Sequence, residues 1–257
     1  MNGFGIVDLA VIPGRKEPRD SSEMVTQLLL GEVYSIEDEK EKWVQVKNNF
    51  DEYVCWIDKK QFVEITHAEF DEYRLNEFPR VTSFSSSGGF ETGDLLLPVG
   101  AVLPFYGKGH FKIRNQKFQS DCKVSPISKE KIPEVAKGYL NTPYLWGGKT
   151  QWGIDCSGLV QVVFSLAGIN LKRDAWQQAE QGETVAFIEE AETGDLAFFD
   201  NSEGRITHVG IVLDGVNGGK EIIHASGRVR INQLDHQGIY DRNKKRYTHQ
   251  LRIIKRY

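Results

Sequence analysis

Gly153-Ile154-Asp155-Cys156-Ser157-Gly158, followed by an apolar run over residues 159–167, is the stretch that decides the fold of the C-terminal half of the chain. The residues behind the cysteine are apolar at helical spacing, and Gly168 stands where a helix would end. The pattern predicts a helix that begins at Cys156. There, unpaired backbone N–H groups and the positive end of the helix dipole favour a thiolate. Cys156 is therefore a candidate nucleophile, although an isolated cysteine is more often a small core residue.

Composition excludes several classes of protein. The chain has 257 residues, which is enough for two domains or three small ones. The formal net charge of −4 argues against a nucleic-acid-binding surface, and 40% hydrophobic with 26% charged residues is ordinary for a soluble protein. Three cysteines do not make a disulfide framework, so Cys55 and Cys122 receive no assigned role.

The N-terminal residues show no basic segment followed by an apolar one, as a secretory signal would. No run approaches the roughly 18 apolar residues of a membrane span. We therefore expect a cytoplasmic protein without membrane association, an expectation that fails if a leader precedes this sequence.

The first half of the chain reads as short β-strands. In residues 1–63 the strand-like runs are 5–12, 24–30, 33–36, 43–46 and 53–57. Charged turns separate them and aromatic residues lie inside them, which predicts a small barrel. Residues 64–79 are polar and are predicted to be a connector. Residues 80–126 again lack helical periods and predict a second, degenerate barrel, although the Ser/Gly run at 85–89 could equally be a flexible linker tip.

From about Lys129 the hydrophobic period changes. Apolar residues near Val135 predict a helix with Pro133 in its first turn, where proline is tolerated. The Cys156 helix comes next, followed by a polar segment over 172–184. Strands are then predicted at residues 195–200, 206–213, 221–226, 229–232 and 251–255. Helices followed by an antiparallel sheet define an α+β domain over residues 127–257.

Two of the six histidines, His208 and His224, lie inside apolar strands. The turn between these strands, residues 214–219, is rich in hairpin residues and has its centre near position 216 or 217. Reflection through position 216, or through the midpoint of 216 and 217, places position 224 or 225 opposite His208. The two Cβ atoms would then lie roughly 5 Å apart, whereas a slip of one residue would send the rings to opposite faces. The remaining histidines, in polar surroundings, are interpreted as surface residues: His67, His110, His236 and His249.

Three interpretations of the histidine pair compete. The first is a pair of sheet histidines without chemistry. The second is a metal site that includes Cys156, but zinc would want a further carboxylate or thiolate, and the sequence has no HExxH or CxxC motif. The third is a nucleophilic site in which His208 accepts the thiol proton and His224 orients the His208 ring. Only the third explains why Cys156 stands at a helix start, so we expect no cofactor.

Several motifs resemble those of the NlpC family of papain-like cysteine peptidases, which cut bacterial cell-wall peptides. They read Pro-Tyr-Leu-Trp-Gly-Gly (143–148), Gly-Ile-Asp-Cys-Ser-Gly-Leu-Val (153–160), Gly-Asp-Leu-Ala-Phe-Phe (194–199), Thr-His-Val-Gly-Ile-Val (207–212) and Ile-His-Ala (223–225). Residues 1–63 resemble a bacterial SH3-like domain through Pro18 and the stretches 22–27, 31–32, 42–46 and 52–57. The resemblance implies an α+β papain-like cysteine peptidase domain preceded by two small all-β SH3-like barrels.

The resemblance also implies roles for single residues. Cys156 would be the nucleophile, His208 the base and His224 the third polar residue, with Tyr144 helping to stabilise the oxyanion. A pocket for the free amine of an N-terminal L-Ala would use Asp174, Glu23 and Tyr53. Trp146 and Ser157 would be further substrate-binding residues. Ala175 stands where relatives commonly carry Ser, so one substrate hydrogen bond is missing or comes from Gln177 or Ser157.

These residues also have simpler interpretations. Tyr144 and Trp146 could be packing residues around a turn. Asp174 could be a helix cap or a solvated acid, and Glu23 an exposed acid.

The implied activity is hydrolysis of the γ-D-glutamyl–diamino acid amide in murein peptides with a free N-terminal L-Ala, which releases L-Ala-γ-D-Glu for recycling. We expect a monomer whose partner is this peptide, with no nucleic-acid or membrane partner. Two alternatives stay open. The same core could act on intact peptidoglycan with the SH3-like modules as wall anchors, or the chain could be a non-catalytic wall-peptide binding protein.

Overall fold

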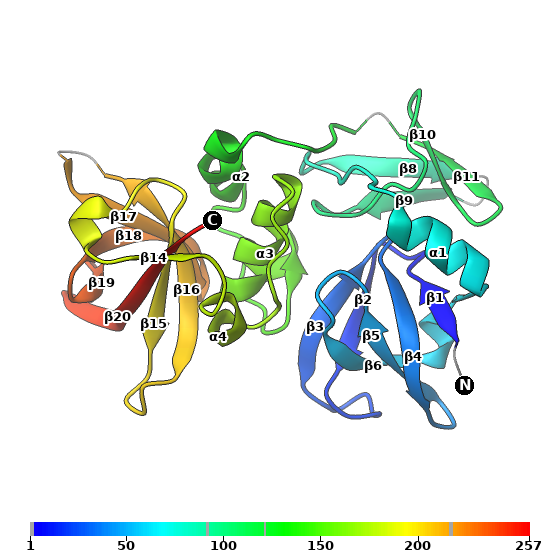
Figure 1. The fold of residues 1–257 in the computed structure, drawn as a ribbon, viewed down its shortest axis with the longest axis horizontal. Coiled ribbons are helices and arrows are strands. Elements are labelled where there is room, and N and C mark those ends of the chain that lie inside the picture. Colours follow the sequence, from blue (N-terminus) through cyan, green and yellow to red (C-terminus); the bar gives the residue numbers. More distant parts are fainter. Residues whose placement is uncertain (1–2, 91–92, 121, 216–217) are drawn as a thin grey trace. The chain divides into compact units, whose positions relative to one another are not determined.

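A computed structural model describes residues 3–90, 93–120, 122–215 and 218–257, and the chain forms two compact units (Figure 1). Unit 1 contains Met1–Pro126 together with Trp146–Gln151, and unit 2 contains Ile127–Leu145 and Trp152–Tyr257. Residues 216 and 217 of the predicted hairpin turn lie outside the described residues.

Unit 1 begins with an antiparallel sheet of seven strands in the order β3-β2-β6-β5-β4-β1-β7. Their bounds are β1 (Phe4–Ile6), β2 (Val11–Arg15), β3 (Met24–Leu29), β4 (Val33–Glu39), β5 (Trp43–Asn48), β6 (Val54–Asp58) and β7 (Glu64–Ile65), with the 3-10 turn η1 (Lys59–Gln61) after β6. Along β5 every second residue is buried, because alternate side chains of a strand face the core. The predicted all-β N-terminal module is confirmed.

The predicted connector contains a helix that the sequence analysis missed, α1 (His67–Leu75). Thr66 and Glu69 form a capping box at its start. Its buried residues, Phe70 and Tyr73, join an apolar cluster in which Phe70 stacks on Phe4 with ring centroids 4.2 Å apart. A helix with so narrow an apolar face gives little periodic signal, and this explains the error.

Residues 80–126 form an antiparallel sheet in the order β10-β11-β8-β9. The bounds are β8 (Ser86–Phe90), β9 (Gly93–Leu97), β10 (His110–Ile113) and β11 (Gln116–Gln119). This sheet shares one apolar cluster with the first sheet, and the cluster includes Phe111, Phe118, Ile6 and Val33. A second SH3-like barrel is therefore not confirmed. The alternative linker tip at 85–89 is wrong, because most of that run belongs to β8.

Residues Trp146–Gln151 pack within unit 1, although their sequence neighbours on both sides belong to unit 2. Lys149, in the short strand β12 (Lys149–Thr150), has its Nζ atom 3.3 Å from Oε1 of Glu32, and both side chains are 1% exposed. Its backbone N–H donates to Gln27 Oε1 at 2.7 Å. Removing either partner of a buried ion pair is strongly destabilising, so this contact holds the segment in place.

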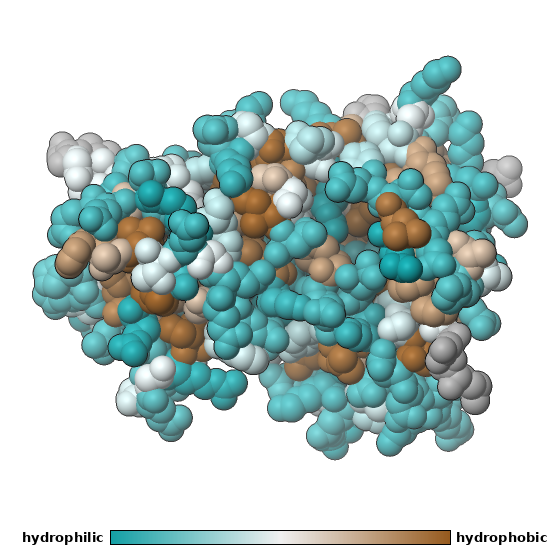
Figure 2. All heavy atoms as spheres, in the orientation of Figure 1, coloured by the Kyte–Doolittle hydropathy of each residue, from teal (hydrophilic) through white to brown (hydrophobic). Residues whose placement is uncertain are grey.

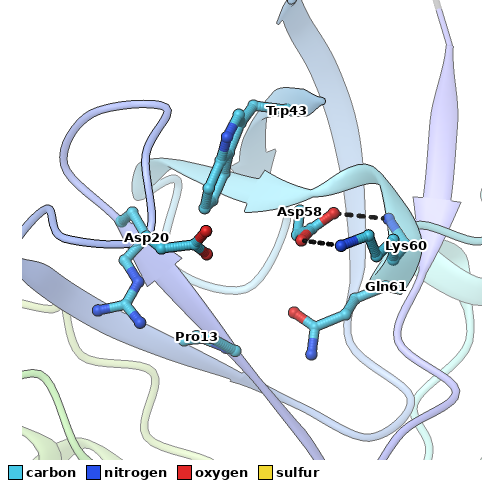
Figure 3. Close-up of a pocket in the computed structure, with 7 residues that line it drawn as sticks. Pro13, Asp20, Trp43, Asp58, Lys60 and Gln61 are labelled. Atoms are coloured by element: carbon cyan, nitrogen blue, oxygen red, sulfur yellow. Dashed lines mark hydrogen bonds and ion pairs between the residues drawn. The ribbon is translucent and has the colours of Figure 1, made fainter. Parts of the chain in front are cut away.

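A polar recess of about 350 Å³ opens on the first sheet of unit 1 (Figure 3). It is lined by Pro13, Arg15, Asp20, Trp43, Asp58, Lys60 and Gln61. Asp58 caps η1 by accepting from the Lys60 N–H at 2.9 Å. Neither Glu23 nor Tyr53 lines the recess, so it is distinct from the pocket that the resemblance implies.

Unit 2 carries helices first and an antiparallel sheet afterwards, which confirms the α+β prediction. The helices are η2 (Lys129–Lys131), α2 (Ile132–Gly138), α3 (Cys156–Leu166), α4 (Ala175–Gln178) and η3 (Ile188–Glu190), and the short strand β13 (Gly153–Ile154) precedes α3. The sheet strands are β14 (Glu183–Val185), β15 (Leu196–Asp200), β16 (Ile206–Asp214), β17 (Lys220–Ser226), β18 (Arg228–Asp235), β19 (Gly238–Asp241) and β20 (Arg246–Arg256). Helix α3 packs against β16 (Figure 1).

The strand order in unit 2 is β14-β20-β15-β16-β17-β18-β19, and β19 also pairs with β20. The sheet therefore closes on itself around an apolar cluster that includes Phe199, Val212 and Ile222. The sequence analysis missed β19 and started the last strand at residue 251, whereas β20 begins at Arg246. The exposed polar and charged residues from 242 to 246 concealed that start.

None of the described helices is long and apolar enough to cross a membrane. The face of the molecule in Figure 2 carries mainly hydrophilic residues with scattered hydrophobic ones.

Candidate active site

Helix α3 begins at Cys156, which confirms the prediction from the sequence. Asp155 is the N-cap, and its Oδ1 accepts from the Gly158 N–H at 2.6 Å. Every residue of α3 is buried, and Gly168 has a φ of +76° just after the helix end. A left-handed glycine is a common helix terminator, so both ends of α3 follow from the sequence.

Arg173 locks the start of α3 from a separate segment. Its guanidinium donates to both carboxylate oxygens of Asp155, at 2.6 and 3.2 Å, and to Ser157 Oγ at 2.8 Å. The side chain of Arg173 is 1% exposed. Ser157, expected to bind substrate, is thus held in this network, where its hydroxyl also donates to Asp155 Oδ1 at 3.3 Å.

The Cys156 thiol is buried, and its environment differs from the predicted dipole-stabilised thiolate. Burial, reinforced by the Asp155 carboxylate, raises the pKa of Cys156 to about 12. The N–H groups of Val209 and Ser157 and the charge of Arg173 oppose that rise in pKa without overcoming it. The resting site therefore holds a thiol. Its contact with Val209 places the sulfur beside the residue that follows His208 in β16.

His208 and His224 meet on one face of the closed sheet. The Nε2 atom of His208 lies 2.8 Å from the Nδ1 atom of His224. Ile211 pairs with Ile223, so the two histidines are diagonal neighbours rather than directly opposite as the hairpin arithmetic predicted. Even so, the register keeps both rings on the same face, because side chains alternate with a period of two.

Asn232 extends the histidine pair into a hydrogen-bonded chain. Its Oδ1 lies 3.0 Å from His224 Nε2, and its Nδ2 donates to the Tyr240 carbonyl at 3.5 Å. This orientation makes His224 Nε2 the donor to Asn232. Nδ1 of His224 must then accept from Nε2 of His208, which leaves Nδ1 of His208 as the nitrogen with a free lone pair. That nitrogen is a proton acceptor.

Burial keeps both histidines neutral at neutral pH. It lowers the pKa of His208 well below the ordinary value, and the neighbouring His224 and His249 lower it further. Burial also lowers the pKa of His224 to about 4, against the opposing effect of its hydrogen bond to Asn232. A neutral imidazole beside a thiol is ready to act as a general base.

His249, interpreted from the sequence as a surface residue, is half-buried and stacks on His208 with ring centroids 4.2 Å apart. That interpretation was wrong because the last strand was predicted to begin two residues after His249. With β20 beginning at Arg246, alternation along the strand would have placed His249 on the face of Leu251.

Tyr144 lies close to the thiol. Its backbone N–H donates to the Gly227 carbonyl at 3.1 Å, which fixes its segment to the end of β17. Burial raises the pKa of Tyr144, the neighbouring Asp155 carboxylate raises it further, and any thiolate formed at Cys156 would act in the same direction. The phenol therefore stays protonated and can donate a hydrogen bond.

Two of the predicted substrate-binding residues meet in unit 1. The indole Nε1 of Trp146 donates to Glu23 Oε1 at 2.8 Å, and Trp146 is 58% exposed. Glu23 is also paired with Lys16, whose Nζ lies 3.3 Å away. The backbone N–H of Tyr53 donates to Asp51 Oδ1, while its ring is partly buried.

Asp174 is the N-cap of α4, as the simpler interpretation of this residue proposed. The backbone N–H of Asp174 donates to Gln177 Oε1 at 3.1 Å. Gln177, considered as a replacement for the missing Ser hydroxyl, is thus occupied in part by the cap. Ala175, in the first turn, is buried.

No group of three or more His, Cys, Asp and Glu side chains within residues 3–90, 93–120, 122–215 and 218–257 could hold a metal ion. The facing nitrogens of His208 and His224 bond to each other, so they do not converge on a shared ligand.

A buried cysteine at a helix start, beside a hydrogen-bonded histidine pair on an antiparallel sheet, defines a papain-like cysteine hydrolase. Comparison with known proteins agrees. The model of the NlpC/P60 family matches residues 141–250, and that of the bacterial dipeptidyl-peptidase SH3 domain matches residues 14–62. The chain belongs to the NlpC/P60 family and is a hydrolase of that cysteine-peptidase type.

Individual relatives cover different shares of the chain. A γ-D-glutamyl-L-lysine dipeptidyl-peptidase of Bacillus subtilis is 30% identical over 219 residues, which is 78% of this chain and 71% of the relative. A bifunctional muramidase/DL-endopeptidase of the same organism is 46% identical over 103 residues, which is 37% of this chain and 31% of the relative. The crystal structure of an NlpC/P60 family protein from Bacillus cereus shares the fold, with a TM-score of 0.82, 21% identity and 99% of each chain covered.

Proposed function

We propose that the protein hydrolyses the γ-D-glutamyl–diamino acid bond of murein peptides with a free N-terminal L-Ala and releases L-Ala-γ-D-Glu. The observation that carries the chemistry is the chain His208–His224–Asn232 beside a buried Cys156. The substrate class is supported by the activity after which the γ-D-glutamyl-L-lysine dipeptidyl-peptidase of Bacillus subtilis is named, because that protein resembles most of this chain.

The first half of the reaction forms a thioester. His208 Nδ1 takes the proton of the Cys156 thiol, and the thiolate attacks the γ-carbonyl carbon of D-Glu. The Tyr144 hydroxyl and the Cys156 backbone N–H donate to the oxyanion. The His208 imidazolium then gives its proton to the leaving amine of the diamino acid, which breaks the amide bond.

The second half releases the dipeptide. His208, neutral again, takes a proton from a water molecule that attacks the thioester carbonyl. The bond to sulfur breaks, the thiolate leaves, and it recovers its proton from His208. Throughout, His224 and Asn232 hold Nε2 of His208 as the donor, so that Nδ1 always serves the reaction.

An amine pocket restricts the substrate. The ammonium of L-Ala would bind the carboxylates of Asp174 and Glu23 with the help of Tyr53, because a cation removed from water needs charged partners. Trp146 orients Glu23 by its hydrogen bond. A pocket that needs a free amine would select peptides already released from the wall.

The test offers L-Ala-γ-D-Glu-diaminopimelate with its N-terminal amine free and N-acetylated, with products followed by mass spectrometry. We expect the free peptide to be cleaved and the acetylated one to be cleaved at least roughly 100-fold more slowly, since loss of a charged hydrogen bond costs about 3 kcal/mol. Equal cleavage would overturn the amine pocket. Turnover that survives Cys156→Ala would overturn the mechanism, and binding without turnover by the unmodified protein would favour a non-catalytic binding protein.

A second candidate is an endopeptidase that acts on intact peptidoglycan. The 46% identity over 103 residues to a bifunctional muramidase/DL-endopeptidase of Bacillus subtilis favours it. Release of soluble fragments from purified cell walls at a rate comparable to tripeptide cleavage would support this candidate. Cleavage of the tripeptide alone would exclude it.

A further inference from the structure

A third histidine reaches the active site from the far side of the closed sheet. Phe199 in β15 pairs with His208 on one side and with Leu251 of β20 on the other. His249 lies two residues before Leu251 and so projects from the same face of β20. The pairing of β20 with β19 as well as β15 closes the sheet, and this curvature brings His249 over His208.

The contact between the two rings is close and nearly parallel. The ring centroids of His208 and His249 lie 4.2 Å apart, and the two ring planes are inclined by 23°. The ring of Phe199 touches both, with centroids 5.8 and 6.0 Å away. His224 meets His249 edge-on at 5.8 Å. His208 is therefore held at one edge by His224 and covered on one face by His249.

From this geometry we propose that His249 is a positioning residue for the base: its neutral ring supports the transient imidazolium of His208, and protonation of His249 removes that support. The inference rests on the proposed role of His208. The aromatic face of a neutral ring attracts a cation stacked on it, whereas a second positive charge at this distance repels it.

The charges around His249 favour its neutral form. Burial lowers its pKa, and the cations Lys244 and Arg230 lower it further. Asp241 at the end of β19 is shared between those two cations, with carboxylate contacts of 4.0 and 3.6 Å. The Nδ1 atom of His249 lies 2.9 Å from the Thr248 hydroxyl.

The remaining titratable groups near His249 are also neutral. They are His208 and His224 on β16 and β17, whose pKa values burial holds low, and the Tyr247 phenol on β20, whose pKa its bond to Asp235 raises. At neutral pH, His208 therefore forms its imidazolium beneath an uncharged ring.

A structural role alone would require only a flat side chain at this position. The proposed role makes two titrations necessary for activity, because His208 and His249 must both be neutral at the start of the reaction. The acid limb of log kcat/KM against pH should then approach a slope of two in the unmodified protein. With His249→Phe, which keeps the aromatic face and cannot be protonated, the slope should fall to one.

The experiment measures kcat and KM for the free-amine tripeptide from pH 3 to 8 in the full chain and three variants. His249→Phe should keep kcat at pH 7.5 within about threefold of the unmodified value. His249→Leu should lower kcat roughly tenfold with KM unchanged, which corresponds to about 1.4 kcal/mol of lost transition-state stabilisation. His236→Gln, which replaces an exposed histidine, is the matched control and should change neither kcat nor the slope. Identical acid limbs in the unmodified protein and His249→Phe would overturn the proposal.

Imidazole NMR separates this proposal from the proposed function. In the Cys156→Ala background, the titration midpoint of His208 should move to higher pH when His249→Phe is added, because a repelling charge is lost. This readout needs no turnover. An unmoved midpoint would overturn the role of His249 even if Cys156 is the nucleophile, and a moved midpoint would sustain the coupling even if the substrate is different. Should His249→Phe fail to fold, His249→Gln gives the same readout without a titrating ring.

Discussion

Replacing Arg173 with methionine should destabilise unit 2 by about 3 to 5 kcal/mol, because it leaves the buried Asp155 carboxylate without its countercharge. The guanidinium makes bonds of 2.6, 3.2 and 2.8 Å to Asp155 and Ser157, and all of them are lost. Asp155 keeps the N–H of Gly158 at 2.6 Å, so we expect a value near the lower end, about 3 kcal/mol. The free energy of unfolding of a small domain is about 5 to 15 kcal/mol in total, so a loss of this size is readily measured.

The assay is urea unfolding followed by far-UV circular dichroism, with amide hydrogen exchange of α3 to assign the transition to unit 2. Arg252→Met is the matched control, because that arginine is 65% exposed and lies 3.8 Å from Asp200. It should cost at most about 1 kcal/mol. The double variant Asp155→Asn/Arg173→Met removes both charges and keeps a capping side chain, so it should recover more than half of the loss. If Arg173→Met lowered the free energy of unfolding no more than Arg252→Met does, the buried ion pair would not stabilise unit 2 as proposed.

Further predictions concern the site and its support. Asn232→Leu should lower kcat roughly 10- to 100-fold with KM unchanged, because leaving the buried His224 N–H without an acceptor costs about 1 to 3 kcal/mol. The ¹⁵N imidazole shifts of this variant should show a mixture of tautomers. His224 has its pKa lowered to about 4 in the fold, so the unfolded chain binds more protons between pH 6.5 and 4. The contribution of His224 to the free energy of unfolding should therefore be complete above pH 6.5 and fall by about 3 kcal/mol as the pH drops to 4. Urea unfolding midpoints measured across this range should depend less on pH in His224→Asn. Gly147→Ala should lower the melting temperature more than Gly204→Ala. Both glycines have a positive φ, but only at Gly147 would an added Cβ lie 2.5 Å from the Met24 carbonyl oxygen. Equal losses would mean that the backbone conformation, and not this clash, causes the destabilisation. Glu23→Gln should raise KM for the free-amine tripeptide about tenfold and leave kcat unchanged, and an unchanged KM would remove Glu23 from the amine pocket.

The elements closest to the nucleophile were the ones that the sequence predicted best. Helix α3 is long, wholly buried and bounded by Asp155 and Gly168, so its apolar period and its ends were all visible. The face shared by His208 and His224 was predictable as well, because a short hairpin turn fixes the register of two neighbouring strands. Only the exact pairing was displaced, from opposite to diagonal.

The parts that the sequence did not predict depend on contacts between distant segments. Arg173 contacts Asp155 across a loop, and no local sequence pattern predicts an ion pair between residues so far apart in the chain. Asn232 and His249 come into the site only when β18 and β20 take their places in the closed sheet, and strand order is set by packing of the whole core. The short helices α1 and α4 present too few buried residues to show a helical period.

A nucleophilic Cys156 would carry an acyl intermediate during turnover, and this intermediate can be detected. An activated substrate, L-Ala-γ-D-Glu p-nitroanilide, has a leaving group that departs easily, so hydrolysis of the thioester should become the slow step. We expect a burst of one nitroaniline per chain and, after acid quenching and peptide mapping, a dipeptidyl group on Cys156. Steady turnover without a burst, with the Cys156 peptide unmodified or the acyl group on another residue, would contradict the role of Cys156 as the nucleophile.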